Sequence, residues 1–132
     1  MKTLYLIRGV PGSGKSSFAK ELLDNGFVQM HFEADSFFYG NDGVYHFDEK
    51  YLPQAHQLCQ DNTWYWLGRN RSVAVSNTST TETEVETYAK IAEEAGAKFV
   101  SIIVENRHGG TNLHNVPEKK IKQMRKRFSV KL

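Results

Sequence analysis

Short apolar segments alternate with longer amphipathic segments along this chain, and the alternation predicts its elements. The apolar segments of strand type lie at 3–8, 27–32, 72–76 and 98–104. The segments with helical spacing lie at 15–25, about 49–67, 82–95 and about 117–128. A chain that alternates in this way builds a parallel sheet with helices on both faces and right-handed crossovers. We therefore expect an α/β fold of three layers around a central parallel sheet of about four or five strands.

A parallel sheet also predicts where functional residues lie. In open α/β sheets, ligands bind beyond the carboxyl ends of the strands, so the residues that follow each strand are the candidates. The segment 99–104 is nearly continuously apolar, which is typical of a strand covered on both faces. We expect it to be a buried strand of this sheet.

The residues that follow the first predicted strand carry the strongest chemical signal. Residues 9–16 read Gly-Val-Pro-Gly-Ser-Gly-Lys-Ser and fit the phosphate-loop pattern G-x-x-x-x-G-K-[ST] at every required position. Glycines let the backbone approach a phosphate, and amide groups at the start of a helix can converge on it. Lys15 can bridge the β- and γ-phosphates, and the Ser16 hydroxyl can bind Mg²⁺. The predicted nucleotide site consists of Gly9, Pro11, Gly12, Ser13, Gly14, Lys15, Ser16 and Ser17.

Two carboxylates follow the second predicted strand. Asp35 can act as a general base that accepts the proton of an attacking hydroxyl in phosphoryl transfer. It can instead bind Mg²⁺ through water, or cap the turn that follows. Glu33 is the weaker candidate for the same functions. After the third predicted strand, where P-loop enzymes often carry an acid, this chain has the neutral Asn77, which can orient a water molecule or a substrate.

Two further segments have a functional and a structural interpretation each. Aromatic residues concentrate in 37–47, where they can stack on a base or pack in the core. The polar, glycine-rich segment at about 105–116 suits a lid over bound nucleotide. Its Arg107 can stabilise charge on the transferring phosphoryl group, or remain a solvated loop residue. Residues 81–84, Thr-Glu-Thr-Glu, predict a capping box at the start of the third helix.

Composition and charge narrow the class of protein. The 132 residues suffice for one domain, which we expect to span 1–132. The net charge is only +2, but seven of the 17 lysines and arginines lie in 117–132, where Glu118 is the one acid. The basic face of the last helix can be solvated or can contact a polyanion such as nucleic acid. The single cysteine, Cys59, excludes an intramolecular disulfide, and no apolar run reaches membrane-spanning length. We expect a soluble, cytoplasmic protein with no membrane partner, and the sequence leaves its oligomeric state open.

The order of these motifs resembles the polynucleotide 5′-hydroxyl kinase-like family of P-loop kinases, which includes the bacteriophage enzyme. The phosphate loop, the helix after it and Asp35 at the end of the second strand match in order. Related small ATPase domains of the AAA and zeta-toxin types share weaker motifs over nearly the whole chain. These motifs are Asp35-Ser36-Phe37-Phe38, Ala55-His56-Gln57-Leu58-Cys59, Asn77-Thr78 and His114-Asn115-Val116-Pro117.

The resemblance implies ATP as donor, Mg²⁺, Asp35 as general base, Arg107 as a lid arginine, and the 5′ end of a nucleic acid as acceptor. The absence of an Asn-Lys-x-Asp guanine motif also disfavours GTP. Phe38 stands where the phage kinase has an arginine that grips substrate, and Asn77 where it has an aspartate. Phe38, Asn77 and Thr78 are therefore the candidate substrate residues. Two alternatives follow, a small-molecule kinase of nucleoside type and an ATP-binding module with little activity that works through a partner.

Overall fold

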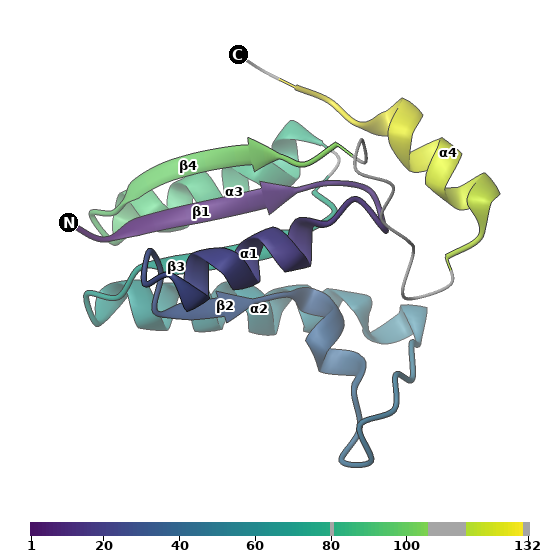
Figure 1. The fold of residues 1–132 in the computed structure, drawn as a ribbon, viewed down its shortest axis with the longest axis horizontal. Helices are drawn as coiled ribbons and strands as arrows, with labels where there is room; N and C mark the ends of the chain where they lie inside the picture. The colour runs from purple at the N-terminus through teal and green to yellow at the C-terminus, as the bar shows by residue number, and fades with distance from the viewer. Residues whose placement is uncertain (80, 106–115, 131–132) are drawn as a thin grey trace.

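Four parallel strands form the sheet that the alternation predicts. The structure, a computed structural model, describes residues 1–79, 81–105 and 116–130. The strands β1 (Thr3–Arg8), β2 (Met30–Phe32), β3 (Val73–Asn77) and β4 (Lys98–Ile103) lie in the order β2-β3-β1-β4 (Figure 1). Every pair is parallel, with Leu4 opposite Val73 and Phe99 and with Met30 opposite Val73. The expected α/β fold is confirmed.

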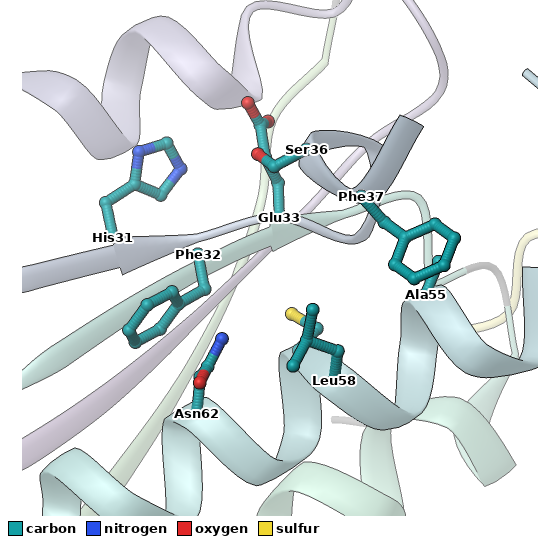
Figure 2. A pocket seen from close by; sticks show the side chains of 9 residues that line it. His31, Phe32, Glu33, Ser36, Phe37, Ala55, Leu58 and Asn62 are labelled. Carbon is teal, nitrogen blue, oxygen red and sulfur yellow. The ribbon is translucent and has the colours of Figure 1, made fainter. Parts of the chain in front are cut away.

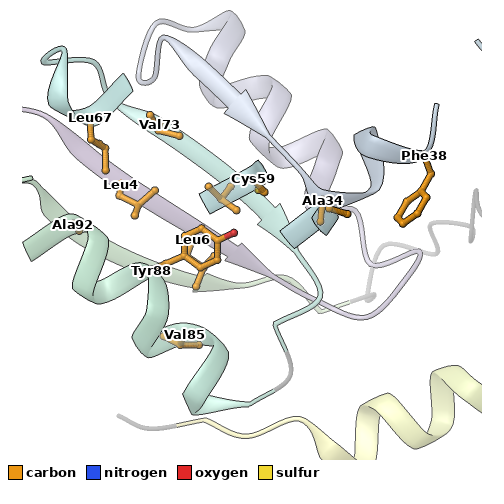
Figure 3. Close-up of a cluster of buried hydrophobic side chains, with 12 residues drawn as sticks. Leu4, Leu6, Ala34, Phe38, Cys59, Leu67, Val73, Val85, Tyr88 and Ala92 are labelled. Carbon is orange, nitrogen blue, oxygen red and sulfur yellow. The ribbon is translucent and has the colours of Figure 1, made fainter. Parts of the chain in front are cut away.

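Helices cover both faces of this sheet. They are α1 (Lys15–Asp24), α2 (Leu52–Gly68), α3 (Glu82–Glu94) and α4 (Glu118–Arg127), with short 3-10 helices η1 (Ala34–Phe38) and η2 (Glu49–Tyr51). Figure 1 shows α1 in front of the sheet and α2 and α3 behind it. The side chains facing α1 include Ile7 and Ala74, which pack with Ala19. The larger cluster behind the sheet joins Leu4, Leu6 and Val73 to the helices α2 and α3 (Figure 3).

The predicted bounds of the second strand were wrong at its start. The strand was expected from residue 27, but it begins at Met30. The amide groups of Phe27 and Val28 donate to the Leu22 carbonyl at 2.9 and 3.3 Å, so they close the end of α1 instead of pairing with β3. The start of the second helix also differs. Residues 49–51 form η2, and α2 begins next to Pro53, which has no N–H to donate to the preceding turn.

The expectation that the fourth strand is covered on both faces was wrong. β4 pairs with β1 alone in the described part of the chain and lies at the edge of the sheet. Its Lys98, Ser101 and Ile103 are exposed. The apolar run at 99–104 therefore belongs to an edge strand. A nearly continuous apolar run does not by itself show that a strand is covered on both faces.

The last two helices begin close to where the sequence predicts. α3 spans 82–94, and the Thr81 hydroxyl accepts a hydrogen bond from the Glu84 amide at 3.4 Å, which is the N-cap half of the predicted capping box. α4 begins at Glu118, one residue later than predicted, and Pro117 is its N-cap. The predicted lid lies outside the described residues except for its ends, and so does Arg107. Among the described residues, no helix is both long and apolar enough to span a bilayer.

Candidate nucleotide site

The phosphate loop connects β1 to α1 and takes a backbone form that only glycine adopts easily. Gly12 and Gly14 have positive φ angles of 83° and 96°, and Gly14 is the N-cap of α1. The Ser13 amide donates to the Val10 carbonyl at 3.1 Å, which closes the turn. The amide groups at the start of α1 stay outside the helix's own hydrogen bonds and can serve an anion.

Gly9 is needed because no side chain fits there. A Cβ atom on Gly9 would overlap Ser13 Oγ and would lie 2.9 Å from the Val104 carbonyl oxygen. Ser13 is fully buried under the loop, whereas Pro11 is half-buried, and Ser16 and Ser17 are exposed on the first turn of α1. The backbone of the loop is thus packed closely against the residue that follows β4.

Three charged groups from different elements lie close enough beside this loop to influence one another. Burial lowers the pKa of the Lys15 ammonium group, and the carboxylates of Asp35 and Glu33 oppose that shift. Lys15 lies on α1, Asp35 on η1 and Glu33 directly after β2. The structure therefore brings the predicted phosphate-binding lysine and the predicted base to the same edge of the sheet.

Glu33 has the more direct connection to the loop. The Ser16 hydroxyl donates to Glu33 Oε2 at 2.7 Å, and Ser76 Oγ donates to the same oxygen at 3.2 Å. His31 Nε2 lies 2.6 Å from Ser76 Oγ. Because Ser76 donates its one hydroxyl hydrogen to Glu33, His31 donates its Nε2–H to Ser76. Burial lowers the pKa of His31, which favours the neutral ring.

Asp35 is held on its other side by Tyr45. The Tyr45 hydroxyl donates to Asp35 Oδ1 at 3.3 Å. Burial raises the pKa of Tyr45 above its ordinary value, and the negative charge of Asp35 adds to that shift. Tyr45 therefore stays protonated and remains a hydrogen-bond donor to the carboxylate that we predict to be the base.

The candidate substrate residues after β3 and in η1 are mostly enclosed. Asn77 is 6% exposed, and its Oδ1 accepts from the Ala34 amide at 2.9 Å. Its Nδ2 donates to the Tyr88 hydroxyl at 3.3 Å and points at Cys59 Sγ at 3.7 Å. Phe38 is 5% exposed and packs in the larger core cluster, so the packing interpretation is confirmed for this ring. Thr78 follows β3 directly and is half-buried.

A pocket lies next to this site, between the β2–η1 segment and α2. Its volume is about 280 Å³, and its lining includes Phe32, Glu33, Phe37, Leu58 and Asn62. Figure 2 shows Asn62 and Leu58 rising from α2, while Glu33 extends toward α1. The volume is close to the lower end, about 300 Å³, of sites that hold small molecules.

Sequence reasoning missed or underrated two residues here. Glu33 ranked below Asp35, because nothing in the chain shows that the β2 end faces Ser16. Arg8 was not considered, although an arginine at the end of an apolar strand is an unusual core residue. Arg8 is 2% exposed and donates from Nε to the Ser79 carbonyl at 2.8 Å and from Nη2 to the Ser129 carbonyl at 2.7 Å.

Comparison with known sequences finds a human protein that resembles part of this chain. No protein-family model matches the chain. Human NEDD4-binding protein 2 is 34% identical over 92 residues, which is 69% of this chain. The chain spans only 5% of the length of that protein.

Comparison with solved structures agrees with the fold. A chain of the Pnkp1/Rnl/Hen1 complex superposes with a TM-score of 0.66 at 16% identity, over 92% of this chain and 38% of the other. The APS kinase CysC of Mycobacterium tuberculosis, in complex with AMPPNP and APS, gives 0.58 at 19% identity over 92% and 66%. Kti12 of Chaetomium thermophilum, in complex with ADP-AlF3, gives 0.62 at 9% identity over 96% and 80%. The chain therefore has the α/β fold of the P-loop kinases.

Proposed function

We propose that this protein is an ATP-dependent kinase that transfers the γ-phosphoryl group to the 5′-hydroxyl of a polynucleotide. The observation that carries the proposal is that the Asp35 carboxylate lies close enough to Lys15 to oppose the lowering of its pKa, beside a loop whose Gly12 and Gly14 have positive φ angles. A cation for the phosphates and a carboxylate for the attacking hydroxyl are the two groups that phosphoryl transfer needs in one place. The superposition on a chain of the Pnkp1/Rnl/Hen1 RNA repair complex, with a TM-score of 0.65 at 16% identity, supports a nucleic-acid acceptor.

Different residues of this chain bind the phosphates, bind the metal and accept the proton. The loop amides and Lys15 bind the phosphates, and Ser16 offers a hydroxyl oxygen to Mg²⁺. Mg²⁺, when bound with the nucleotide, neutralises charge on the β- and γ-phosphates. Asp35 accepts the proton of the attacking hydroxyl. As it does so, the hydroxyl oxygen bonds to the γ-phosphorus, and the bond between the γ-phosphorus and the β-phosphate oxygen breaks. Arg107, outside the described residues, is proposed to add positive charge from the lid.

The test is label transfer from γ-labelled ATP to a 5′-hydroxyl oligonucleotide in Mg²⁺ buffer. We expect wild-type protein to label the oligonucleotide, and Asp35→Asn to lower the rate by a factor of about 10² or more, with ATP affinity nearly unchanged. Glu49→Gln is the matched control, because Glu49 is an exposed carboxylate in η2, and it should keep the wild-type rate. Transfer by Asp35→Asn at the wild-type rate would show that Asp35 is not the base.

The pocket beside Glu33 favours a second candidate, a kinase for a small alcohol such as a nucleoside. Its apolar walls suit a flat ring, and the Asn62 amide offers a donor and an acceptor at the rim. The same assay with free nucleosides separates the two candidates. Transfer of label to the nucleoside, with none on the oligonucleotide, would favour the small acceptor. Tight ATP binding without label on either acceptor would favour a nucleotide-binding module that works through a partner.

A further inference from the structure

P-loop enzymes often carry an acidic residue at the carboxyl end of this strand to help bind the nucleotide's cation, but β3 has none there. Asn77 stands there, is neutral, and is turned into the core toward Ala34, Cys59 and Tyr88. It therefore holds η1 in place and offers no charge to a cation beside Ser16. Any compensating charge must come from another element.

Glu33 is the acid in contact with Ser16, although the two residues are 17 positions apart in sequence. The hydrogen of the Ser16 hydroxyl goes to Glu33 at 2.7 Å, which leaves the oxygen lone pairs of Ser16 for a cation. The same carboxylate oxygen is fixed from β3 by Ser76, which His31 holds in turn. Glu33 is thus held in position at the end of β2, the strand next to β3, and beside the first turn of α1.

We propose that Glu33 supplies the negative charge beside Ser16 that holds the divalent cation of the bound nucleotide, in place of an acid at the end of β3. This inference rests on the proposed nucleotide-binding function. Mg²⁺ prefers hard oxygen donors, keeps several of its waters, and is bound by one or two carboxylates together with substrate phosphates. A hydroxyl paired with one carboxylate suits that requirement. The described residues contain no cluster of three or more His, Cys, Asp or Glu side chains that could hold a metal without the phosphates.

The arrangement also separates the tasks of the two carboxylates. Asp35 is paired with the Tyr45 hydroxyl, and Glu33 is paired with the hydroxyls of Ser16 and Ser76. Loss of Glu33 should therefore weaken metal binding, whereas loss of Asp35 should stop transfer and leave the metal in place.

The test measures metal affinity without turnover. Binding of Mn²⁺ is followed by electron paramagnetic resonance in the presence of saturating AMPPNP, for the wild type, Glu33→Gln, Glu33→Asp and Asp35→Asn. AMPPNP affinity is measured separately in EDTA. We expect Glu33→Gln to weaken Mn²⁺ binding by a factor of about 10 to 100, the range for loss of a partner that orients a ligand. Glu33→Asp, which keeps the charge, should lose less, and Asp35→Asn should lose no more than about 3-fold. Glu105→Gln is the matched control, since Glu105 is an exposed carboxylate after β4 at the same edge of the sheet.

The outcomes separate this inference from the proposed function. Unchanged Mn²⁺ affinity in Glu33→Gln, or an equal loss in Asp35→Asn, would overturn the inference and leave the kinase proposal standing. Failure of the wild-type protein to bind AMPPNP would overturn both. If Glu33→Gln does not fold, Glu33→Asp decides, because a shorter carboxylate should lower Mn²⁺ affinity and leave AMPPNP affinity in EDTA unchanged.

Discussion

At Gly9, one missing Cβ atom decides how closely the phosphate loop lies against the end of β4. The neighbours that a side chain would meet are Ser13, which is fully buried, and the backbone carbonyl of Val104, which cannot rotate away. Glycine is needed at position 9 because only a hydrogen atom fits between the loop and these neighbours. The φ angle of Gly9 does not itself require glycine.

Gly9→Ala should therefore destabilise the protein by about 1–3 kcal/mol, the usual cost of overpacking, and should weaken nucleotide binding. Urea unfolding and a nucleotide titration measure the two effects. Gly68→Ala is the control, because no heavy atom lies within 4 Å of a Cβ built on Gly68 at the end of α2. The control should be neutral or more stable by up to about 1 kcal/mol. Equal stability of the two variants would contradict the packing argument.

Among the elements, α4 separates an apolar stripe from a basic face. Ile121 is 4% exposed, and Met124 and Phe128 are half-buried, as their spacing predicts. The exposed positions are Lys119, Lys120, Lys122, Arg125, Lys126 and Arg127. Figure 1 shows α4 beyond the carboxyl ends of the strands, the same end of the sheet where the phosphate loop lies. We therefore predict that a nucleic-acid acceptor bound at this end of the sheet contacts the basic face.

The combined variant Lys122→Gln, Lys126→Gln should bind a single-stranded oligonucleotide more weakly and with less salt dependence. Each lost phosphate contact lowers the slope of log K against log salt by about 0.7. Fluorescence anisotropy of a labelled oligonucleotide between about 50 and 200 mM salt measures that slope. Lys98→Gln is the control, because Lys98 is exposed at the opposite, amino-terminal end of β4. An unchanged slope in the α4 variant would show that this face is only solvated.

Across the whole molecule, Arg8 ties together segments that are far apart in the chain. Its guanidinium group donates to the carbonyls of Ser79 and Ser129, lies 3.8 Å from the Glu82 carboxylate, and stacks 4.7 Å from the centre of the Phe128 ring. Ser129 in turn accepts a hydrogen bond from the Glu82 amide at 3.1 Å. Arg8 directly precedes the phosphate loop, so these contacts hold the loop, the start of α3 and the segment after α4 in one arrangement.

Arg8→Ala should lower the free energy of unfolding by about 3 kcal/mol or more, because it leaves two carbonyls and a carboxylate without their buried partner. Arg71→Ala is the control, since Arg71 is exposed, and it should change stability by no more than about 0.5 kcal/mol. Urea unfolding of both variants checks the difference. A cost for Arg8→Ala as small as that of the control would mean that the segment after α4 is held by other contacts.

The sequence by itself determined the features that depend on local pattern. Strands and helices followed from apolar spacing, because each element buries its own face, and only ends such as residues 27–29 were misplaced. The phosphate loop followed from eight contiguous residues, whose backbone form is a local property of Gly12 and Gly14.

Only the tertiary structure decided which strands are neighbours, and the roles of several residues depend on that order. β3 lies between β2 and β1, so Ser76 can hold Glu33 while Glu33 faces Ser16, and Asn77 turns inward to hold η1. The same order leaves β4 at the edge, against the expectation from its apolar residues. These contacts join residues tens of positions apart, and the spacing of apolar and polar residues along one chain carries no information about which of them meet.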